Sequence, residues 1–440
     1  MKKLSQREAA VAALKEITQD KAYSNLTLRR ILAEQGHMDR LQKAFVTEIV
    51  AGCVRNLLLI DHIIANFSKT PLPKIKPAIL NILRISVYQL KFMDKVPTFA
   101  VCNEAVEMVK GQGLGGLGGY VNGVLRNIAR THIEMPADLA TRYSVQAWIV
   151  EHFLTEIGEA QTQTLLESIM RPPAITLAVN TLKTTAKQLV EILQAEGVDA
   201  SPATLANAVN ISKTSDISAL PSFKQGLYHI MDEAAMLALL CAAPPENASI
   251  IDLCAAPGGK AFLAAYMSGT GASIEANDLH LHKIKLLEQG IKRLGLKNVS
   301  ASLADGRVHR PELNKTADLL ILDAPCSGLG TLRKRPDLKL NKQADSPEVL
   351  ARLTREIIEN SWQYVKVGGR LLFSTCTISK VENLDNFNWI IQNLPFKPVD
   401  FSERIPPMLS YPSAKDGHIQ VLPQDFESDG FFIALLERTE

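Results

Sequence analysis

Two cysteines and an aspartate follow apolar runs, at points where the sequence predicts strands to end. "LILDAPCSG" places Asp323 and Cys326 after one apolar run, and "LLFSTCT" places Cys376 after another. The carboxyl ends of parallel strands meet at one edge of a sheet, where such sheets bind ligands. One buried cysteine is more often a small packed hydrophobe than a nucleophile. Two cysteines and an acid at one edge favour chemistry.

Methylation of carbon 5 of a pyrimidine is a reaction that needs such a set. That carbon becomes reactive only after a thiolate adds to carbon 6, and the product is freed by loss of the carbon 5 proton and then of the thiol. Two cysteines could divide attack and release between them. The residues alone do not say which cysteine does which.

A cofactor loop is predicted at "DLCAAPGGK", residues 252–260, which follows an apolar strand and opens a helix. Glycines there let the backbone approach a ligand, and amides at a helix N-terminus favour an anionic group. The alternative is a tight turn without a ligand. A Walker loop is excluded, because Cys254 stands where its first glycine would be and Ala261 follows Lys260.

Two acids follow the next two predicted strands. Asp278 lies 20 residues after Gly258, a distance at which an acid normally binds ribose hydroxyls, and Asp305 is placed to reach a base. Each acid alone is more often a helix cap. Together they outline a nucleoside site, and since G-x-G-x-x-G is missing, S-adenosylmethionine is favoured over a dinucleotide.

A basic cluster, Arg333, Lys334 and Arg335, follows Cys326 and could hold RNA phosphates, although an exposed loop is the alternative. Residues 1–135 hold 19 Lys and Arg against 11 Asp and Glu, which favours a polyanionic partner for this part, with a solvated helix surface as the alternative. The cysteines form no C-x-x-C pair, so we expect no metal site, no disulfides and a reducing cytoplasm. No apolar run is long enough to span a membrane.

The pattern of elements predicts an α/β fold preceded by helices. Residues 1–131 show helical periodicity, with Ser5 as a capping residue, and 132–144 form a linker. Residues 145–245 mix strands and helices in a small α+β domain. Strands and helices alternate over 246–440, which predicts a doubly wound, mostly parallel sheet.

The motifs resemble a known family. "DLCAAPGGK", "DAPCSGLGTLRKRPD" and "FSTCT…EN" are similar to those of the RNA 5-methylcytosine methyltransferases with two active-site cysteines. "ILRISVYQL", "NEAVEMVK" and "GYVNGVLRNIAR" resemble the helical RNA-binding domain of the antitermination factor NusB. The combination resembles the bacterial 16S ribosomal RNA cytosine-5 methyltransferases. It implies a NusB-like domain, an RRM-like middle domain and a Rossmann-like domain with a seven-stranded sheet.

The resemblance also implies residue roles. Cys376 matches the nucleophile, Cys326 the cysteine that assists release, and Asp323 an acid near the methionine end of the cofactor and the base. Asp278 and Asp305 match the acids at the ribose and the adenine, and Lys260 could also face the base. The S-adenosylmethionine loop is implied to be Cys254, Ala255, Ala256, Pro257, Gly258, Gly259 and Lys260.

The middle domain departs from the family pattern at three positions, Gln146, Ala178 and Met231. The resemblance implies a monomer that acts on free or early-assembly 16S RNA. Two rival functions stay open: the same chemistry on transfer RNA or 23S RNA, and a non-catalytic RNA-binding or ribosome assembly factor. Binding alone would not need two thiols.

Overall fold

The computed structural model describes residues 3–212 and 216–440, which form two compact units. Met1–Thr162 and Arg335–Lys342 make up the first unit, and Gln163–Lys334 with Gln343–Glu440 make up the second. The short segment that begins at Arg335, the last residue of the predicted basic cluster, thus belongs to the first unit. Within the described ranges, no helix is long and apolar enough to cross a membrane.

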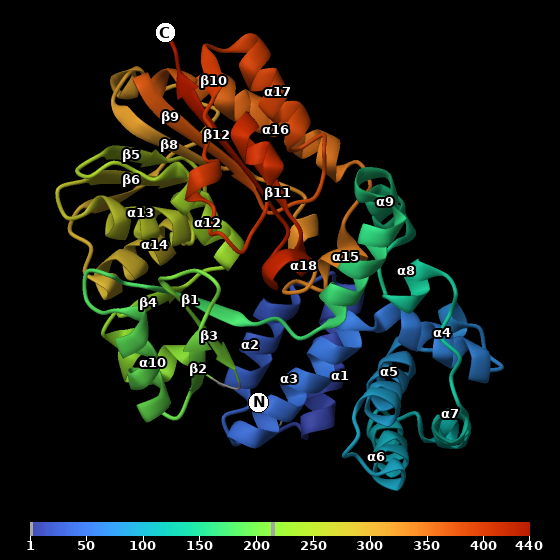
Figure 1. The fold of residues 1–440 in the computed structure, drawn as a ribbon. Coiled ribbons are helices and arrows are strands. Elements are labelled where there is room, and N and C mark those ends of the chain that lie inside the picture. The colour runs from blue at the N-terminus through green and yellow to red at the C-terminus, as the bar shows by residue number, and fades with distance from the viewer. Residues whose placement is uncertain (1–2, 213–215) are drawn as a thin grey trace. The chain divides into compact units, whose positions relative to one another are not determined.

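The first unit is helical, as its periodicity predicts (Figure 1). Ser5 begins the first helix with a capping box: its hydroxyl accepts the Glu8 N–H at 3.2 Å, and the Glu8 carboxylate accepts the Ser5 N–H at 2.8 Å. The apolar faces of the helices form one core. The elements are α1 (Gln6–Gln19), α2 (Ser24–Glu34), α3 (Arg40–Arg55), α4 (Leu57–Phe67), α5 (Pro77–Phe92), α6 (Thr98–Gly111), α7 (Gly118–Arg130) and α8 (Leu139–Arg142).

A buried lysine anchors α15 (Leu338–Asn341) in this unit. The Lys339 ammonium is fully buried and donates hydrogen bonds to the carbonyl oxygens of Arg55 at 2.8 Å and Tyr143 at 3.0 Å. Burial, helped by the charge of Arg55, lowers the pKa of Lys339 to about 7. This lysine therefore has a structural place and is not part of an exposed basic surface.

The second unit begins within α9 (Ala147–Met170), which is interrupted at Gly158. A small sheet follows, with strand order β2-β3-β1-β4 and every pair antiparallel. Apolar residues of α10 (Ala186–Ala195) pack on one face of the sheet. The strands are β1 (Ile175–Val179), β2 (Asp199–Pro202), β3 (Ala208–Ser212) and β4 (Tyr228–Ile230).

The three residues that depart from the family pattern have intramolecular contacts. Ala178 is fully buried in β1. Met231 is 7% exposed, and its side chain lies beside Gly259. Gln146, in the first unit, donates to the Lys342 carbonyl oxygen at 3.2 Å and accepts the Trp148 indole N–H at 3.1 Å. All three are therefore used in packing or in hydrogen bonds within the chain.

The large sheet has the order β10-β12-β9-β8-β5-β6-β7, with β11 paired to β12. It has eight strands in the described residues rather than the expected seven, because the short β11 adds to the antiparallel end. The five strands β5 to β9 are parallel, as alternation predicts, and β7 forms one edge of the sheet. The strands are β5 (Ser249–Asp252), β6 (Ser273–Asp278), β7 (Val299–Leu303), β8 (Ala317–Asp323), β9 (Val365–Thr375), β10 (Phe396–Pro398), β11 (His418–Val421) and β12 (Phe431–Arg438).

Helices cover both faces of this sheet (Figure 1). Successive strand residues alternate between two apolar cores, so that Leu319 and Ile321 face one and Leu320 and Leu322 face the other. Residues of α12 (Glu233–Ala242), α13 (Gly259–Ser268) and α14 (Leu281–Leu294) line the first core. Residues of α16 (Ser346–Ser361) and α17 (Leu384–Asn393) line the second. The chain is thus doubly wound, and the carboxyl ends of β5, β8 and β9 lie side by side.

Candidate active site

The two predicted cysteines are in contact at the carboxyl edge of the large sheet. Cys326 follows β8 and Cys376 follows β9, and their Sγ atoms lie 3.3 Å apart. Both are free thiols and both are partly exposed. Neighbouring parallel strands bring them together, since Asp323 of β8 pairs in register with Ser374 of β9. The convergence predicted from the strand ends is confirmed.

The contact between the two thiols affects the pKa of Cys326. The pKa of Cys326 is raised well above its ordinary value, first by the hydrogen bond to Cys376, then by burial, with further contributions from nearby negative charge. Either thiol can be the donor in this 3.3 Å contact. With Cys326 as the donor, the hydrogen bond would stabilise a thiolate at the neighbouring sulfur.

A third cysteine, Cys254, lies in the predicted cofactor loop. Its pKa is raised far above the ordinary value, first by burial and then by the charges of Asp252 and Asp323. A thiol held protonated in this way is not a good nucleophile. Cys254 is therefore a poor candidate for the nucleophile.

An ion pair joins the cofactor loop to β8. Lys260 is 6% exposed, and its ammonium lies 2.7 Å from Asp323 Oδ2 and 4.8 Å from the centre of the Phe431 ring. The other carboxylate oxygen of Asp323 accepts the Ser374 hydroxyl at 3.0 Å. Asp323 remains 37% exposed, so a buried cation orients a carboxylate that a substrate can still reach.

The loop Cys254–Lys260 connects β5 to α13 and contains a cis peptide bond before Pro257. Gly258 has φ +113°, and a Cβ there would lie 2.2 Å from the Phe262 ring. A glycine is required at this position, because any side chain would meet both strain and a clash. The backbone amides at the start of α13 are thereby left able to approach an anionic ligand group.

Asp252, at the end of β5, provides a test of whether the predicted cofactor fits. Its side chain is 1% exposed, and within the described residues neither carboxylate oxygen has a hydrogen-bond partner. Burial raises its pKa to about 7, against the opposing effect of the Lys260 charge. A buried carboxylate without a donor is costly, and a ligand ammonium would satisfy it. The amino acid part of S-adenosylmethionine carries such a group, so the residues fit the cofactor.

The two further predicted acids lie at the same edge, after β6 and β7. Asp278 is 5% exposed; it accepts the His280 N–H at 3.1 Å, and the Lys283 ammonium lies 3.3 Å away. Asp305 is bound by Arg307, whose hydrogen bonds lower the pKa of this carboxyl. Both acids are thus placed along the strand ends, where the sequence predicts the nucleoside.

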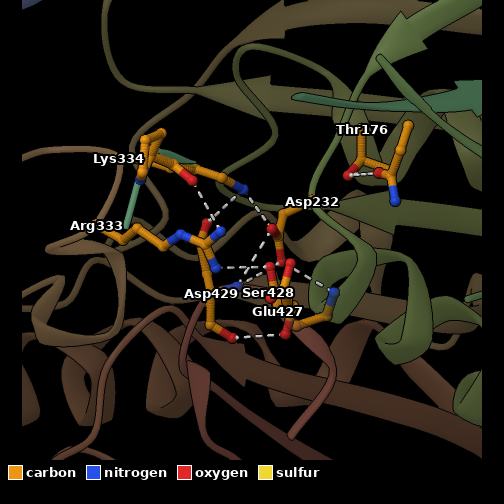
Figure 2. A network of polar contacts seen from close by, with 10 residues as sticks. Thr176, Asp232, Arg333, Lys334, Glu427, Ser428 and Asp429 are labelled. Carbon is orange, nitrogen blue, oxygen red and sulfur yellow. Dashed lines mark hydrogen bonds and ion pairs between the residues drawn. The ribbon is translucent and has the colours of Figure 1, made fainter. Parts of the chain in front are cut away.

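The predicted basic cluster does not form one exposed patch. Arg333 is buried and donates to the carbonyl oxygens of Pro172 at 2.9 Å and Glu427 at 3.2 Å. Lys334 forms ion pairs with Asp232 and Asp429, the centre of the network in Figure 2. Arg335, in the first unit, is exposed. Two of the three side chains are therefore occupied by structural contacts, and Arg335 alone is left as a predicted RNA contact.

Polar residues next to the cysteines were not singled out from the sequence. Ser327 and Thr377, each one residue after a cysteine, contact each other, and Ser327 also contacts the buried Glu382. Asn383 contacts Thr375 and Thr377, the two neighbours of Cys376. The signal was present in the quoted "FSTCT…EN" motif, where the Glu-Asn pair had no assigned role. No group of three or more potential ligands for a metal ion occurs in the part of the chain that the structure describes.

The chain matches three family models along its length. Residues 239–437 match the model for the 16S rRNA methyltransferase RsmB/F, residues 4–130 match the NusB family, and residues 146–218 match the ferredoxin-like domain of RsmF/B-like methyltransferases. The three matches correspond to a NusB-like helical domain, a ferredoxin-like middle domain and a methyltransferase domain.

Similar proteins cover the whole chain. A probable ribosomal RNA small subunit methyltransferase B of Bacillus subtilis is 35% identical, over 100% of both chains. A protein of the same name from Synechocystis is 30% identical, over 99% of this chain and 100% of that one. The solved structure of PH0851 is 26% identical, with a TM-score of 0.83, and covers 99% of this chain and 100% of that chain.

Proposed function

This chain belongs to the RsmB/F family of 16S ribosomal RNA methyltransferases, and we propose that it methylates carbon 5 of a cytosine through a covalent adduct with Cys376. Enzymes of this family depend on S-adenosylmethionine, which supplies an electrophilic methyl group. The observation that carries the proposal is the 3.3 Å contact between two thiols beside the cofactor loop.

Cys376 begins the reaction in this proposal. Its thiolate adds to carbon 6 of the cytosine, and the electron pair of the carbon 5–carbon 6 double bond moves to carbon 5, which then accepts the methyl group. The hydrogen bond from Cys326 stabilises the thiolate before attack. Base and thiol must meet outside a helical stack, so the cytosine has to be extruded or single-stranded.

Release requires two further bond changes. Carbon 5 gives its proton to water, and the electron pair left behind re-forms the double bond as the carbon–sulfur bond breaks and the Cys376 thiolate leaves. Cys326 lies against the sulfur that must leave, which supports its assignment to this second stage. The proposal assigns Asp323 and Lys260 to the polar edge of the base, and their ion pair at the same edge of the sheet supports this assignment.

Methyl transfer to RNA tests this function directly. The purified chain, labelled S-adenosylmethionine and unmethylated 16S RNA should yield 5-methylcytidine on nucleoside analysis. Cys376→Ala should abolish transfer while it still binds cofactor, and Cys102→Ala, a buried cysteine in the first unit, should stay active. Transfer RNA and 23S RNA are the competing substrates. Full activity of Cys376→Ala, or label in another nucleoside, would overturn the proposal.

Finer assignments rest on the same family membership. We propose domain boundaries at 1–131, 145–245 and 246–440, with a linker over 132–144. We also propose that the protein is a cytoplasmic monomer that acts on free or early-assembly 16S RNA. Loss of one 5-methylcytosine in bisulfite sequencing of RNA from a deletion strain would identify the target nucleotide.

A further inference from the structure

A buried carboxylate connects the residues that follow the two cysteines. Glu382 is 2% exposed, and its Oε1 accepts the Ser327 N–H at 2.7 Å while its Oε2 accepts the Ser327 hydroxyl at 2.6 Å. Because the Ser327 hydroxyl gives its proton to Glu382, its oxygen is the acceptor in the 2.7 Å contact with the Thr377 hydroxyl. Ser327 and Thr377 are both fully buried. The chain of hydrogen bonds therefore runs from beside Cys376 to beside Cys326.

The neighbouring residue holds the other side of Cys376. Asn383 Oδ1 accepts the Thr375 hydroxyl at 2.6 Å, and its Nδ2 donates to the Thr377 carbonyl oxygen at 3.1 Å and to Gln420 Oε1 at 2.8 Å. Thr375 and Thr377 flank Cys376 in sequence. A single buried amide thus binds the Thr375 hydroxyl on one side of Cys376 and the Thr377 backbone carbonyl on the other.

Two donors converge on Glu382 in a way that a neutral amide cannot reproduce. A carboxylate offers two acceptor oxygens, whereas a glutamine offers one acceptor and one donor group. Charge-assisted hydrogen bonds of this kind are short and strong in a buried setting. The negative charge of Glu382 is also one of the later contributions, after the Cys376 hydrogen bond and burial, that raise the pKa of Cys326. Glu382 therefore acts on both the position and the protonation of the pair.

We propose that Glu382 is a positioning residue that holds the two thiols in contact through Ser327 and Thr377, so that attack and release occur in one site. The part of this inference that concerns attack and release rests on the proposed function. The thiol spacing does not, since it is a property of the protein without RNA. Asn383 serves the same end by fixing the backbone of Cys376.

Disulfide formation tests the contact between the Cys326 and Cys376 sulfurs without any methyl transfer. Diamide takes up two hydrogen atoms from two thiols and joins their sulfurs as a disulfide, and the rate depends on the thiolate fraction and on how well the two sulfurs meet. Loss of the Glu382 charge favours the thiolate and would speed the reaction, so slower formation in Glu382→Gln reports poorer contact of the sulfurs. The Cys326–Cys376 disulfide is quantified by mass spectrometry of peptides from the full chain. Glu382→Gln should slow its formation about tenfold or more. Asp385→Asn, which removes a partly exposed acid three residues away, should leave the rate unchanged.

The second measurement concerns the reaction. Glu382→Gln should lower kcat about 10- to 100-fold at nearly unchanged KM for RNA, since misplacement by about 1 Å costs rates of this order. It should also raise the fraction of enzyme trapped on RNA as a denaturation-resistant adduct, and move the pH profile to lower pH, because Cys326 ionises more easily. Thermal melting and cofactor binding check that the variant folds. Ser327→Ala should show a smaller effect in the same direction.

The outcomes separate the two claims. If the disulfide forms as fast in Glu382→Gln as in Asp385→Asn, and the two variants have the same kcat, the positioning role is wrong. If disulfide formation with diamide is slower in Glu382→Gln, as expected, but the unsubstituted chain methylates no cytosine, the positioning role stands and the proposed function fails.

Discussion

The Lys260 ammonium lies 2.7 Å from the Asp323 carboxylate, and this contact links the cofactor loop to the strand that leads to Cys326. Lys260 is almost fully buried, whereas Asp323 is 37% exposed. The buried partner is held by the fold, and the exposed partner remains accessible at the carboxyl edge of the sheet. One ion pair therefore connects the predicted cofactor loop to the end of β8.

Removal of that lysine should damage catalysis more than folding. Lys260→Met leaves Asp323 without its cation, and we expect methyl transfer to fall about 100-fold or more, because the carboxylate is no longer oriented. Single-turnover transfer to 16S RNA measures this. Lys366→Met, which breaks the partly exposed pair with Asp318 on the same sheet, should change the rate less than about twofold. Equal rates for the two variants would contradict the role of Lys260.

The network in Figure 2 leads to a prediction about stability. Lys334→Met leaves the two acids Asp232 and Asp429, which are 12% and 10% exposed, without their cation. Removal of one partner from a buried ion pair lowers the free energy of unfolding by about 3–5 kcal/mol, whereas an exposed pair contributes about 0–1 kcal/mol to it. Urea unfolding should therefore show a large decrease in the free energy of unfolding for Lys334→Met. The decrease should be small for Lys397→Met, whose ion pair with Glu437 is more exposed. Similar losses would argue against a structural role for Lys334.

Asp252 predicts a pH dependence of stability. Its pKa is about 7 in the cofactor-free fold, above the value of about 3.9 for an unfolded chain. A carboxyl whose pKa is raised by folding adds most to the free energy of unfolding at pH values below its pKa in the unfolded chain. That contribution is lost as pH rises through about 7. The Tm difference between Asp252→Asn and the unsubstituted chain should therefore rise in favour of the variant from about pH 4 to 7, and level off by about pH 8.

The same variant should bind cofactor less tightly. Titration calorimetry at about pH 8 should show about 10-fold or greater loss of S-adenosylmethionine affinity, since the amide of the variant carries no charge for the ligand ammonium. A Tm difference that does not change with pH, together with unchanged affinity, would contradict both the buried charge and its ligand.

Arg335 is the exposed member of the predicted basic cluster. Arg335→Met should weaken RNA binding about 2- to 10-fold and reduce the slope of log affinity against log salt by about one, if the guanidinium contacts a phosphate. Filter binding at several salt concentrations measures this, with Lys397→Met as the surface control. A slope equal to that of the unsubstituted chain would remove Arg335 from the RNA interface.

Strand ends were the part of the site that could be predicted from local pattern. Asp323, Cys326 and Cys376 each follow an apolar run, and parallel pairing then places them at one edge. The contact of the two thiols follows from that rule. Their roles do not, because both sulfurs have the same position relative to a strand, and only the family resemblance distinguishes them.

Contacts between distant residues could not be predicted in this way. Lys334 has partners 102 and 95 residues away, and Glu382 binds Ser327 across 55 residues. A run of basic residues looks the same whether its charges meet solvent or buried acids. Burial decided between the two interpretations of "RKR", and a single sequence contains no local signal for it.

Formation of a covalent RNA adduct tests the central claim most directly. Cys326→Ala, incubated with 16S RNA and S-adenosylmethionine, should form a complex that survives a denaturing gel, and peptide mapping should place the bond at Cys376. The double variant Cys326→Ala and Cys376→Ala should form none. An adduct that forms instead in Cys376→Ala, with the bond at Cys326, would contradict the assignment of the nucleophile.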